Sequence, residues 1–233
     1  MSSDELRGIV LQPQDAAPPG LLEGWARRRD IALEIVPTQE RALPRPDAAK
    51  HAFAIVLGAS ASLARDTPPW AQDVLAWLRA ADSECLPVLG ICFGAQALAA
   101  AFGGSVYRLD TPEIGWVEVA TADAARVPAG PWLAWHEDRM TAPPLAYELA
   151  SNAFGTQAFC LRRHLAVQFH PEVTADIVRG WASFPRSRLP ETGQTVEDLM
   201  TGFAELGEAA AARAGQLFDG FAERAGLAAG VAS

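Results

Sequence analysis

Short apolar runs recur along the first hundred positions, and polar stretches with helical spacing separate them. The apolar runs predict strands at 8–12, 31–37, 52–58 and 86–89. Helices are predicted at about 21–29 and 69–82, and an alanine-rich helix follows residue 92. Strands that are apolar on both faces and alternate with helices are typical of a covered parallel sheet. We therefore expect an α/β fold, flavodoxin-like, with a mostly parallel central sheet and helices on both faces.

The pattern changes after residue 104. Six short strand-like runs follow, with few helical signals between them, at 105–109, 116–120, 132–136, 147–152, 156–161 and 165–170. They predict a small antiparallel extension of the sheet. Helical spacing returns after Thr195, which is expected to cap a helix, and a second helical stretch covers 217–221. We expect one domain over 1–188 and C-terminal helices over 189–233 that pack on the domain or on a partner.

Composition excludes several classes of protein. Half of the 233 residues are hydrophobic and a fifth are charged, which predicts a globular fold. A net charge of −9 without a basic stripe argues against a nucleic-acid partner. No apolar run approaches the roughly 18 residues of a membrane span, and the first residues carry no secretory signal. Three cysteines without a Cys-x-x-Cys pair predict neither disulfides nor a zinc site, so a cytoplasmic setting is expected.

Cys92 is the strongest candidate for chemistry. It lies between Gly90 and Gly94, where a predicted strand turns into a helix. This is the cysteine counterpart of the serine nucleophile elbow, because the flanking glycines permit the sharp turn. A helix amino terminus next to the sulfur favours the thiolate. The pattern therefore predicts a nucleophilic cysteine.

His170 and Glu172 supply what such a nucleophile needs. If residues 166–172 are extended, both side chains point to the same face, because strand side chains repeat every two residues. A histidine held by a carboxylate can accept the thiol proton and later return it to a leaving group. Two other histidines, His51 and His164, fall in polar stretches and are expected to be exposed.

The motifs GICFGAQ at 90–96, FHPE at 169–172 and LGAS at 57–60 resemble those of the class I (triad-type) glutamine amidotransferases. Further matches at 68–70, 103–107, 113–116 (EIGW) and 135–138 (WHED) resemble free-standing proteins similar to the glutaminase half of GMP synthase. The resemblance implies that Cys92 is the nucleophile, His170 the acid–base and Glu172 its orienting carboxylate. It also implies an oxyanion hole from the main-chain N–H of Phe93 and one from Gly58 or Ala59.

The resemblance places the substrate's glutamyl part against five residues: Gln96, Trp135, His136, Glu137 and Asp138. One departure from the family stands in the oxyanion loop, where Gly58-Ala59-Ser60 replaces Gly-Gly-Pro. Ala59 can donate its N–H there only if its φ suits a residue with a Cβ atom. The role of Glu113, in the EIGW segment, stays open between substrate contact and structural support.

The expected function is that of a glutamine amidohydrolase, which releases ammonia through a cysteine thioester for a separate synthetase or another biosynthetic partner. The expected chemistry needs neither a metal nor a cofactor. One alternative keeps the site but takes a larger γ-linked amide, as a γ-glutamyl peptidase or hydrolase would. Another is a catalytically dormant regulatory homologue, and the C-terminal helices leave a homodimer open.

Overall fold

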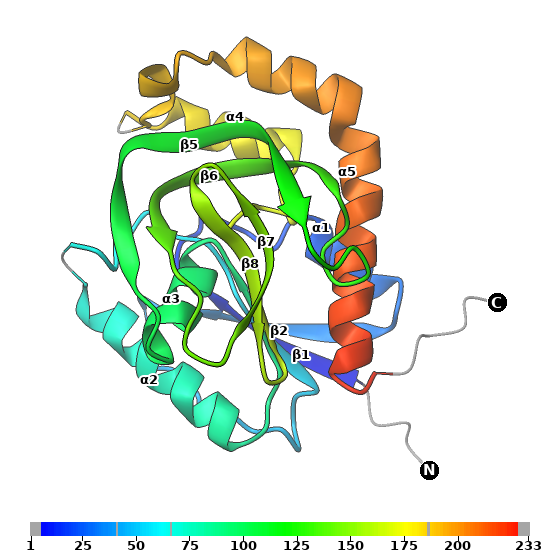
Figure 1. Ribbon diagram of the computed structural model, residues 1–233. Helices are drawn as coiled ribbons and strands as arrows, with labels where there is room; N and C mark the ends of the chain where they lie inside the picture. The colour runs from blue at the N-terminus through cyan, green and yellow to red at the C-terminus, as the bar shows by residue number, and fades with distance from the viewer. Residues whose placement is uncertain (1–5, 41, 66, 186, 228–233) are drawn as a thin grey trace.

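A computed structural model describes residues 6–40, 42–65, 67–185 and 187–227 (Figure 1). The described strands form one nine-stranded sheet in the order β2-β1-β3-β4-β9-β8-β6-β5-β7. Five strands run parallel to one another: β1 (Leu6–Gln12), β2 (Ile31–Pro37), β3 (Phe53–Val56), β4 (Val88–Ile91) and β9 (His164–Val167). The other four are antiparallel: β5 (Val106–Thr121), β6 (Gly130–Met140), β7 (Tyr147–Asn152) and β8 (Gly155–Leu161).

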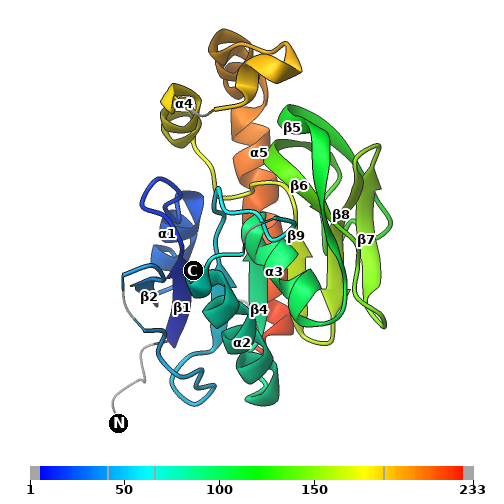
Figure 2. The ribbon, with the colours of Figure 1, turned by 90° about the vertical axis from the view of Figure 1, so that its left-hand side faces the viewer.

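Helices cover both faces of the parallel strands. Alternate side chains of β1 divide between them: Ile9 and Leu11 pack with α2 (Pro69–Ser83) and α3 (Phe93–Ala101), whereas Val10 packs in the core that includes α1 (Leu21–Arg27). In Figure 2, α2 and α3 lie in front of the strands and the long helix α5 (Val196–Arg224) lies behind them. Because strand side chains alternate, each strand contributes to two separate apolar cores. This arrangement explains why the strands read as continuous apolar runs.

The antiparallel part of the sheet is larger than expected. The runs predicted at 105–109 and 116–120 are one strand, β5, which pairs with β6 along most of its length. The register shifts between Arg108 and Glu113, so a local irregularity interrupts the sequence pattern without ending the strand. The sheet is mixed, and the expectation of a small extension is wrong.

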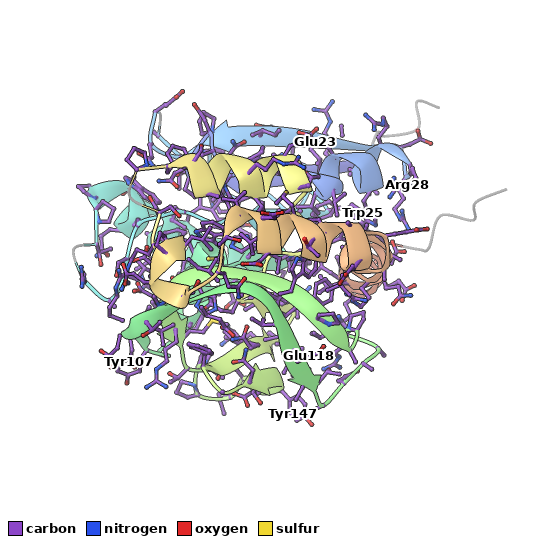
Figure 3. The ribbon with its side chains drawn as sticks, turned by 90° about the horizontal axis from the view of Figure 1, so that it is seen from above. Glu23, Trp25, Arg28, Tyr107, Glu118 and Tyr147 are labelled. Atoms are coloured by element: carbon purple, nitrogen blue, oxygen red, sulfur yellow. The ribbon has the colours of Figure 1, made fainter. Side chains whose placement is uncertain are left out.

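Within the described residues, the C-terminal region contains one long helix, α5, where two helical stretches were expected. Thr195 caps α5 with a capping box, in which its hydroxyl accepts from the N–H of Asp198 and the Asp198 carboxylate accepts from the N–H of Thr195. Near its far end, Leu217, Phe218 and Phe221 are buried in the same core as α1. Figure 3 shows Trp25 beside α5, and its indole N–H donates to Asp219 Oδ1 at 2.7 Å. The division of the chain at 188/189 stays a prediction.

Two shorter helical segments were not predicted. Helix α4 (Ala175–Ser183) follows Thr174, whose hydroxyl accepts from the N–H of Ile177, and a 3-10 turn, η1, covers Leu189–Thr192. None of the helices in the described ranges is long and apolar enough to cross a membrane.

The expectation that His51 and His164 are exposed is wrong, because both are almost fully buried. His164 Nδ1 accepts from the N–H of Val88, and its Nε2 lies 3.1 Å from Asp82 Oδ1. Desolvation by burial lowers the pKa of His164 despite this carboxylate. The residue is a structural link between β9, β4 and α2, which polarity along the chain does not reveal.

Candidate active site

Cys92 occupies a sharp turn between β4 and α3. Its φ of 51° and ψ of −105° lie in a region that residues with a Cβ atom rarely adopt, at a typical cost of about 1–3 kcal/mol. The turn is held by the Cys92 N–H, which donates to Val167 O at 2.8 Å, and by the Cys92 carbonyl, which accepts from Gln96 N at 3.0 Å. The predicted elbow is present.

Each flanking glycine is required by a close approach. A Cβ atom at Gly90 would lie 2.5 Å from Gly94 O, and one at Gly94 would run into the carbonyl oxygen of Val56 on β3. Both contacts are with backbone atoms, which cannot move aside as a flexible side chain can. The Gly-x-Cys-x-Gly spacing therefore lets α3 start directly against the sheet.

His170 and Glu172 are brought together, but not by a strand. β9 ends at Val167, His170 follows in irregular backbone, and Glu172 lies in a turn, so the expected extension through 172 is wrong. The His170 N–H donates to Leu133 O at 2.8 Å, which anchors the segment to β6. His170 Nδ1 then lies 2.7 Å from Glu172 Oε1, and both side chains are buried.

The Glu172 backbone is held from the first helix. Its carbonyl accepts from the N–H of Leu21 at 2.8 Å, at the start of α1. Gly20 has a φ of 55°, and a Cβ atom there would collide with the same carbonyl oxygen. Two segments far apart in the sequence are thus fixed to each other at the site.

Cys92 and His170 converge on Gly58. An added Cβ atom at Gly58 would lie 3.0 Å from His170 Cε1 and 3.7 Å from Cys92 Cβ. Desolvation by burial opposes the imidazolium form, but the charges of Glu172 and of the Cys92 thiolate outweigh it and raise the pKa of His170 to about 10. His170 Nε2, the ring nitrogen that does not face Glu172, has no hydrogen-bond partner among the described residues. The His170 imidazole thus lies between the Cys92 sulfur and the Glu172 carboxylate, whose charges favour its protonated form.

Three main-chain N–H groups near the sulfur can hold an oxyanion. In the part of the chain that the structure describes, those of Phe93, Gly58 and Ala59 donate no hydrogen bond. Ala59 does not have a positive φ, so its conformation suits a residue with a Cβ atom. An alanine at position 59, where the family pattern has glycine, is therefore compatible with the oxyanion-binding role that the resemblance implies.

A cleft of about 740 Å³ opens beside the sulfur. Its lining includes all five residues predicted to contact the substrate: Gln96, Trp135, His136, Glu137 and Asp138. The Gln96 amide donates to Asp138 O at 3.1 Å and to Gln168 Oε1 at 3.3 Å, and Cys92 Sγ lies 3.8 Å from Trp135 O. The structure therefore gathers the predicted residues on one wall, formed by β6 and α3.

Four further residues line or support the cleft and were missed. Arg108 contacts Glu137 and Asp138, Arg188 lies 3.3 Å from Glu137, and Ser62 donates to Asp138 Oδ2 at 2.5 Å. The Trp181 ring lies 4.7 Å from that of His170, and its N–H donates to Ala16 O. These residues come from four different segments of the chain. From the sequence alone, only their residue types, arginine and tryptophan, could have pointed to the cleft.

The described residues contain no group of three or more His, Cys, Asp or Glu side chains placed to hold a metal ion.

Comparison with known families decides the assignment. The sequence matches the family described as "Glutamine amidotransferase class-I" over residues 25–177. The chain belongs to this family. Two glutamine amidotransferase structures, from Thermotoga maritima and Methylobacillus flagellatus, share the fold of this class-I chain with TM-scores of 0.83 and 0.82. Each is 21% identical and aligns with 94% of this chain, and this chain covers 99% and 95% of them, respectively.

The class-I chain is also similar to part of several GMP synthases (glutamine-hydrolyzing). That of Rhodopseudomonas palustris is 31% identical over 187 residues, which is 74% of this chain and 33% of the relative. That of Nitrosomonas eutropha is 40% identical over 106 residues, 38% of this chain and 20% of the relative. The chain thus spans no more than a third of the length of these relatives.

Proposed function

We propose that this protein is a glutamine amidohydrolase with a Cys92–His170–Glu172 triad. One observation carries the proposal: a strained cysteine at a helix amino terminus adjoins an imidazole that is 2.7 Å from a buried carboxylate. This is the arrangement by which a thiol is activated and its charge stabilised. Membership of the class-I family supports glutamine as the source of the amide.

In the proposed reaction, the Cys92 thiolate attacks the side-chain carbonyl carbon of glutamine. The new S–C bond converts the carbonyl into a tetrahedral oxyanion, which the N–H groups of Phe93 and of Gly58 or Ala59 stabilise. The oxyanion collapses, the C–N bond breaks, and His170 gives its Nε2 proton to the leaving ammonia. His170 then takes a proton from water, whose oxygen attacks the γ-glutamyl thioester. The S–C bond breaks, glutamate leaves, and Cys92 is again a thiolate beside protonated His170.

The ammonia is proposed to serve a separate synthetase. The similar relatives are GMP synthases, and this chain covers only a part of each. The free cysteines among the described residues are compatible with the predicted cytoplasmic setting, which stays a prediction.

The size of the cleft favours a second candidate substrate. A volume of about 740 Å³ falls among the pockets that hold drug-sized ligands, and the lining continues past Cys92 to Gln14, Gln39 and Phe184. A γ-glutamyl amide of a larger amine would use the same wall for its glutamyl part and this extension for its amine. The acyl chemistry would be unchanged.

Turnover of two substrates by wild type and Cys92→Ala tests the proposal. We expect glutamate release from glutamine that falls at least 10³-fold in Cys92→Ala, because the thioester cannot form. A γ-glutamyl dipeptide assayed in parallel distinguishes the two substrates. If the wild type releases glutamate from neither, and a glutamine-like diazoketone fails to label Cys92, the site is dormant and the proposal is wrong. Cys85→Ala, at an exposed cysteine, is the matched control.

A further inference from the structure

A cluster of buried and half-buried polar side chains adjoins the cleft wall and has no part in the proposed reaction. Glu113 comes from β5, His136 from β6, Asn152 from the end of β7 and Gln157 from β8. Glu113, His136 and Gln157 are each at most 3% exposed. A buried carboxylate and a buried imidazole are costly unless their partners satisfy them.

One backbone N–H determines how the two amides are oriented. The N–H of Phe154 donates to Asn152 Oδ1 at 2.9 Å, so the atom that lies 2.5 Å from Glu113 Oε1 is Asn152 Nδ2. Gln157 Nε2 lies 3.0 Å from both Asn152 Oδ1 and Glu113 Oε2. Each oxygen of Glu113 therefore accepts from an amide. A glutamine at position 113 has only one acceptor oxygen and could not do the same.

His136 faces an acceptor at each ring nitrogen. Nδ1 lies 2.9 Å from the carbonyl oxygen of Asp138, which can only accept, so Nδ1 carries a proton. Nε2 lies 2.6 Å from Glu113 Oε2, at ion-pair distance although not aligned as a straight hydrogen bond. At this separation an unprotonated Nε2 and an ionised carboxylate would repel each other, which favours one proton on the pair. With that proton on either atom, the pair has no net charge, which is the state that burial favours.

The pair connects to the nucleophile through one carbonyl. Asp138 O accepts both from His136 Nδ1 and from Gln96 Nε2, and Gln96 lies one helical turn after Cys92 on α3. The Asp138 carboxylate, on the cleft side, accepts from Ser62 and pairs with Arg108. Displacement of the Asp138 backbone would therefore change both the cleft wall and the Gln96 amide.

We propose that Glu113 and His136 share one proton as a net-neutral buried pair and act as positioning residues for the glutamyl side of the cleft. The inference rests on the proposed function, because it names that side as the part that binds the substrate. It assigns the EIGW and WHED segments a joint role. Neither side chain takes part in the acyl transfer.

Glu113→Gln tests the proposal, with Glu118→Gln as the matched control. Glu118 lies on the same strand and is exposed (Figure 3). In Glu113→Gln we expect labelling of Cys92 by a glutamine-like diazoketone to slow at least tenfold and KM for glutamine to rise at least tenfold. Alkylation of Cys92 by iodoacetamide, which needs no glutamyl subsite, should stay within twofold of wild type. Glu118→Gln should leave all three unchanged.

Equal diazoketone labelling of Glu113→Gln and wild type would overturn the positioning role. A second measurement uses the wild type and so does not depend on whether a variant folds. NMR can report the ring protonation of each of the four histidines once their signals are assigned. We expect a protonated Nδ1 on His136 and one more proton on either Nε2 or the Glu113 carboxyl. A His136 with a single ring proton beside an ionised Glu113 would overturn the shared proton. A wild type inert to glutamine and to the diazoketone would instead contradict the proposed function.

Discussion

Single residues set the charge balance of the site. Cys92 has a strained backbone because it must present its sulfur at the start of α3, and His170 is buried between that sulfur and Glu172. The opposite charges raise the pKa of His170 to about 10 even though desolvation by burial opposes the charged form. Over the neutral pH range, the imidazole is therefore held as a cation.

This raised pKa predicts how stability changes with pH. Between about 6.5 and 10 the folded protein binds a proton at His170 that the unfolded chain has released. The contribution of His170 is therefore complete below pH 6.5 and is lost as pH rises toward 10, by at most about 1.4 kcal/mol per pH unit. Glu172→Gln removes the nearer negative charge, so its free energy of unfolding should fall less steeply over this range.

Urea unfolding at several pH values from 6.5 to 9.5 measures this difference. His170→Gln, which has no imidazole to titrate, should show the shallow slope of Glu172→Gln. Parallel slopes for the wild type and both variants would contradict the raised pKa.

Local spacing predicted the centre of the site and little of its surroundings. Cys92 between two glycines, and a histidine two residues before a glutamate, are short-range patterns whose chemistry can be read directly. Arg108, Arg188 and Trp181 reach the cleft only through tertiary packing, from segments with no shared pattern. The run predicted as a strand over 165–170 ends at Val167, and beyond it the main-chain N–H of His170 donates to Leu133 O on β6.

At the scale of elements, the close contact of α3 with β3 fixes the position of the nucleophile. Gly94→Ala would place a methyl group against the Val56 carbonyl, so the helix would have to move. We expect a loss of about 1–3 kcal/mol of unfolding free energy and a lower rate of Cys92 labelling. Thermal or urea unfolding measures the first effect.

Gly215→Ala is the control for the same substitution in a helix without a close contact. No atom lies within 4 Å of its added Cβ, and Gly215 is inside α5. We expect a gain of about 0.5–1 kcal/mol, since alanine has the higher helix propensity. A Gly94→Ala protein as stable as the wild type would show that the helix does not depend on this contact.

Continuous apolar runs identified the parallel strands, and the sequence pattern failed where strand pairing or helix capping decided the boundary of an element. β1 to β4 were predicted near their observed positions because both of their faces are apolar. β5 was divided in two because its middle, near Asp110 and Thr111, is polar and irregular yet still belongs to the strand. α4 is only nine residues long, and its apolar face of Ile177, Val178 and Trp181 and its Thr174 cap were present in the sequence but were not recognised.

At the scale of the whole molecule, α5 contributes to the main core. We still propose 189–233 as a C-terminal tail region. Substitutions on its buried face test whether this region unfolds independently of the rest of the protein. Phe218 and Phe221 are 1% and 2% exposed; Phe218 packs against Trp25 of α1, and Phe221 packs against Phe53 of β3. We expect Phe218→Ala to lower the unfolding free energy of the whole protein by about 3–5 kcal/mol.

Val196→Ala, on the same helix at a 40% exposed position, should change stability by less than about 0.5 kcal/mol. Urea unfolding followed by the fluorescence of the tryptophans reports on the body of the protein. If Phe218→Ala lowers the midpoint for α5 alone and leaves the body unchanged, the tail is an independent unit. A single shifted transition would show that the two parts unfold together.

The position of β9 has a consequence for synthesis of the chain. Of the described strands it is the last to be made, yet it lies between β4 and β8, where the parallel and antiparallel strands meet. It also accepts the Cys92 N–H and leads directly into the loop that holds His170. During translation the two sheet halves must therefore wait for a late central strand, and a nascent chain that ends before residue 172 lacks part of the proposed triad.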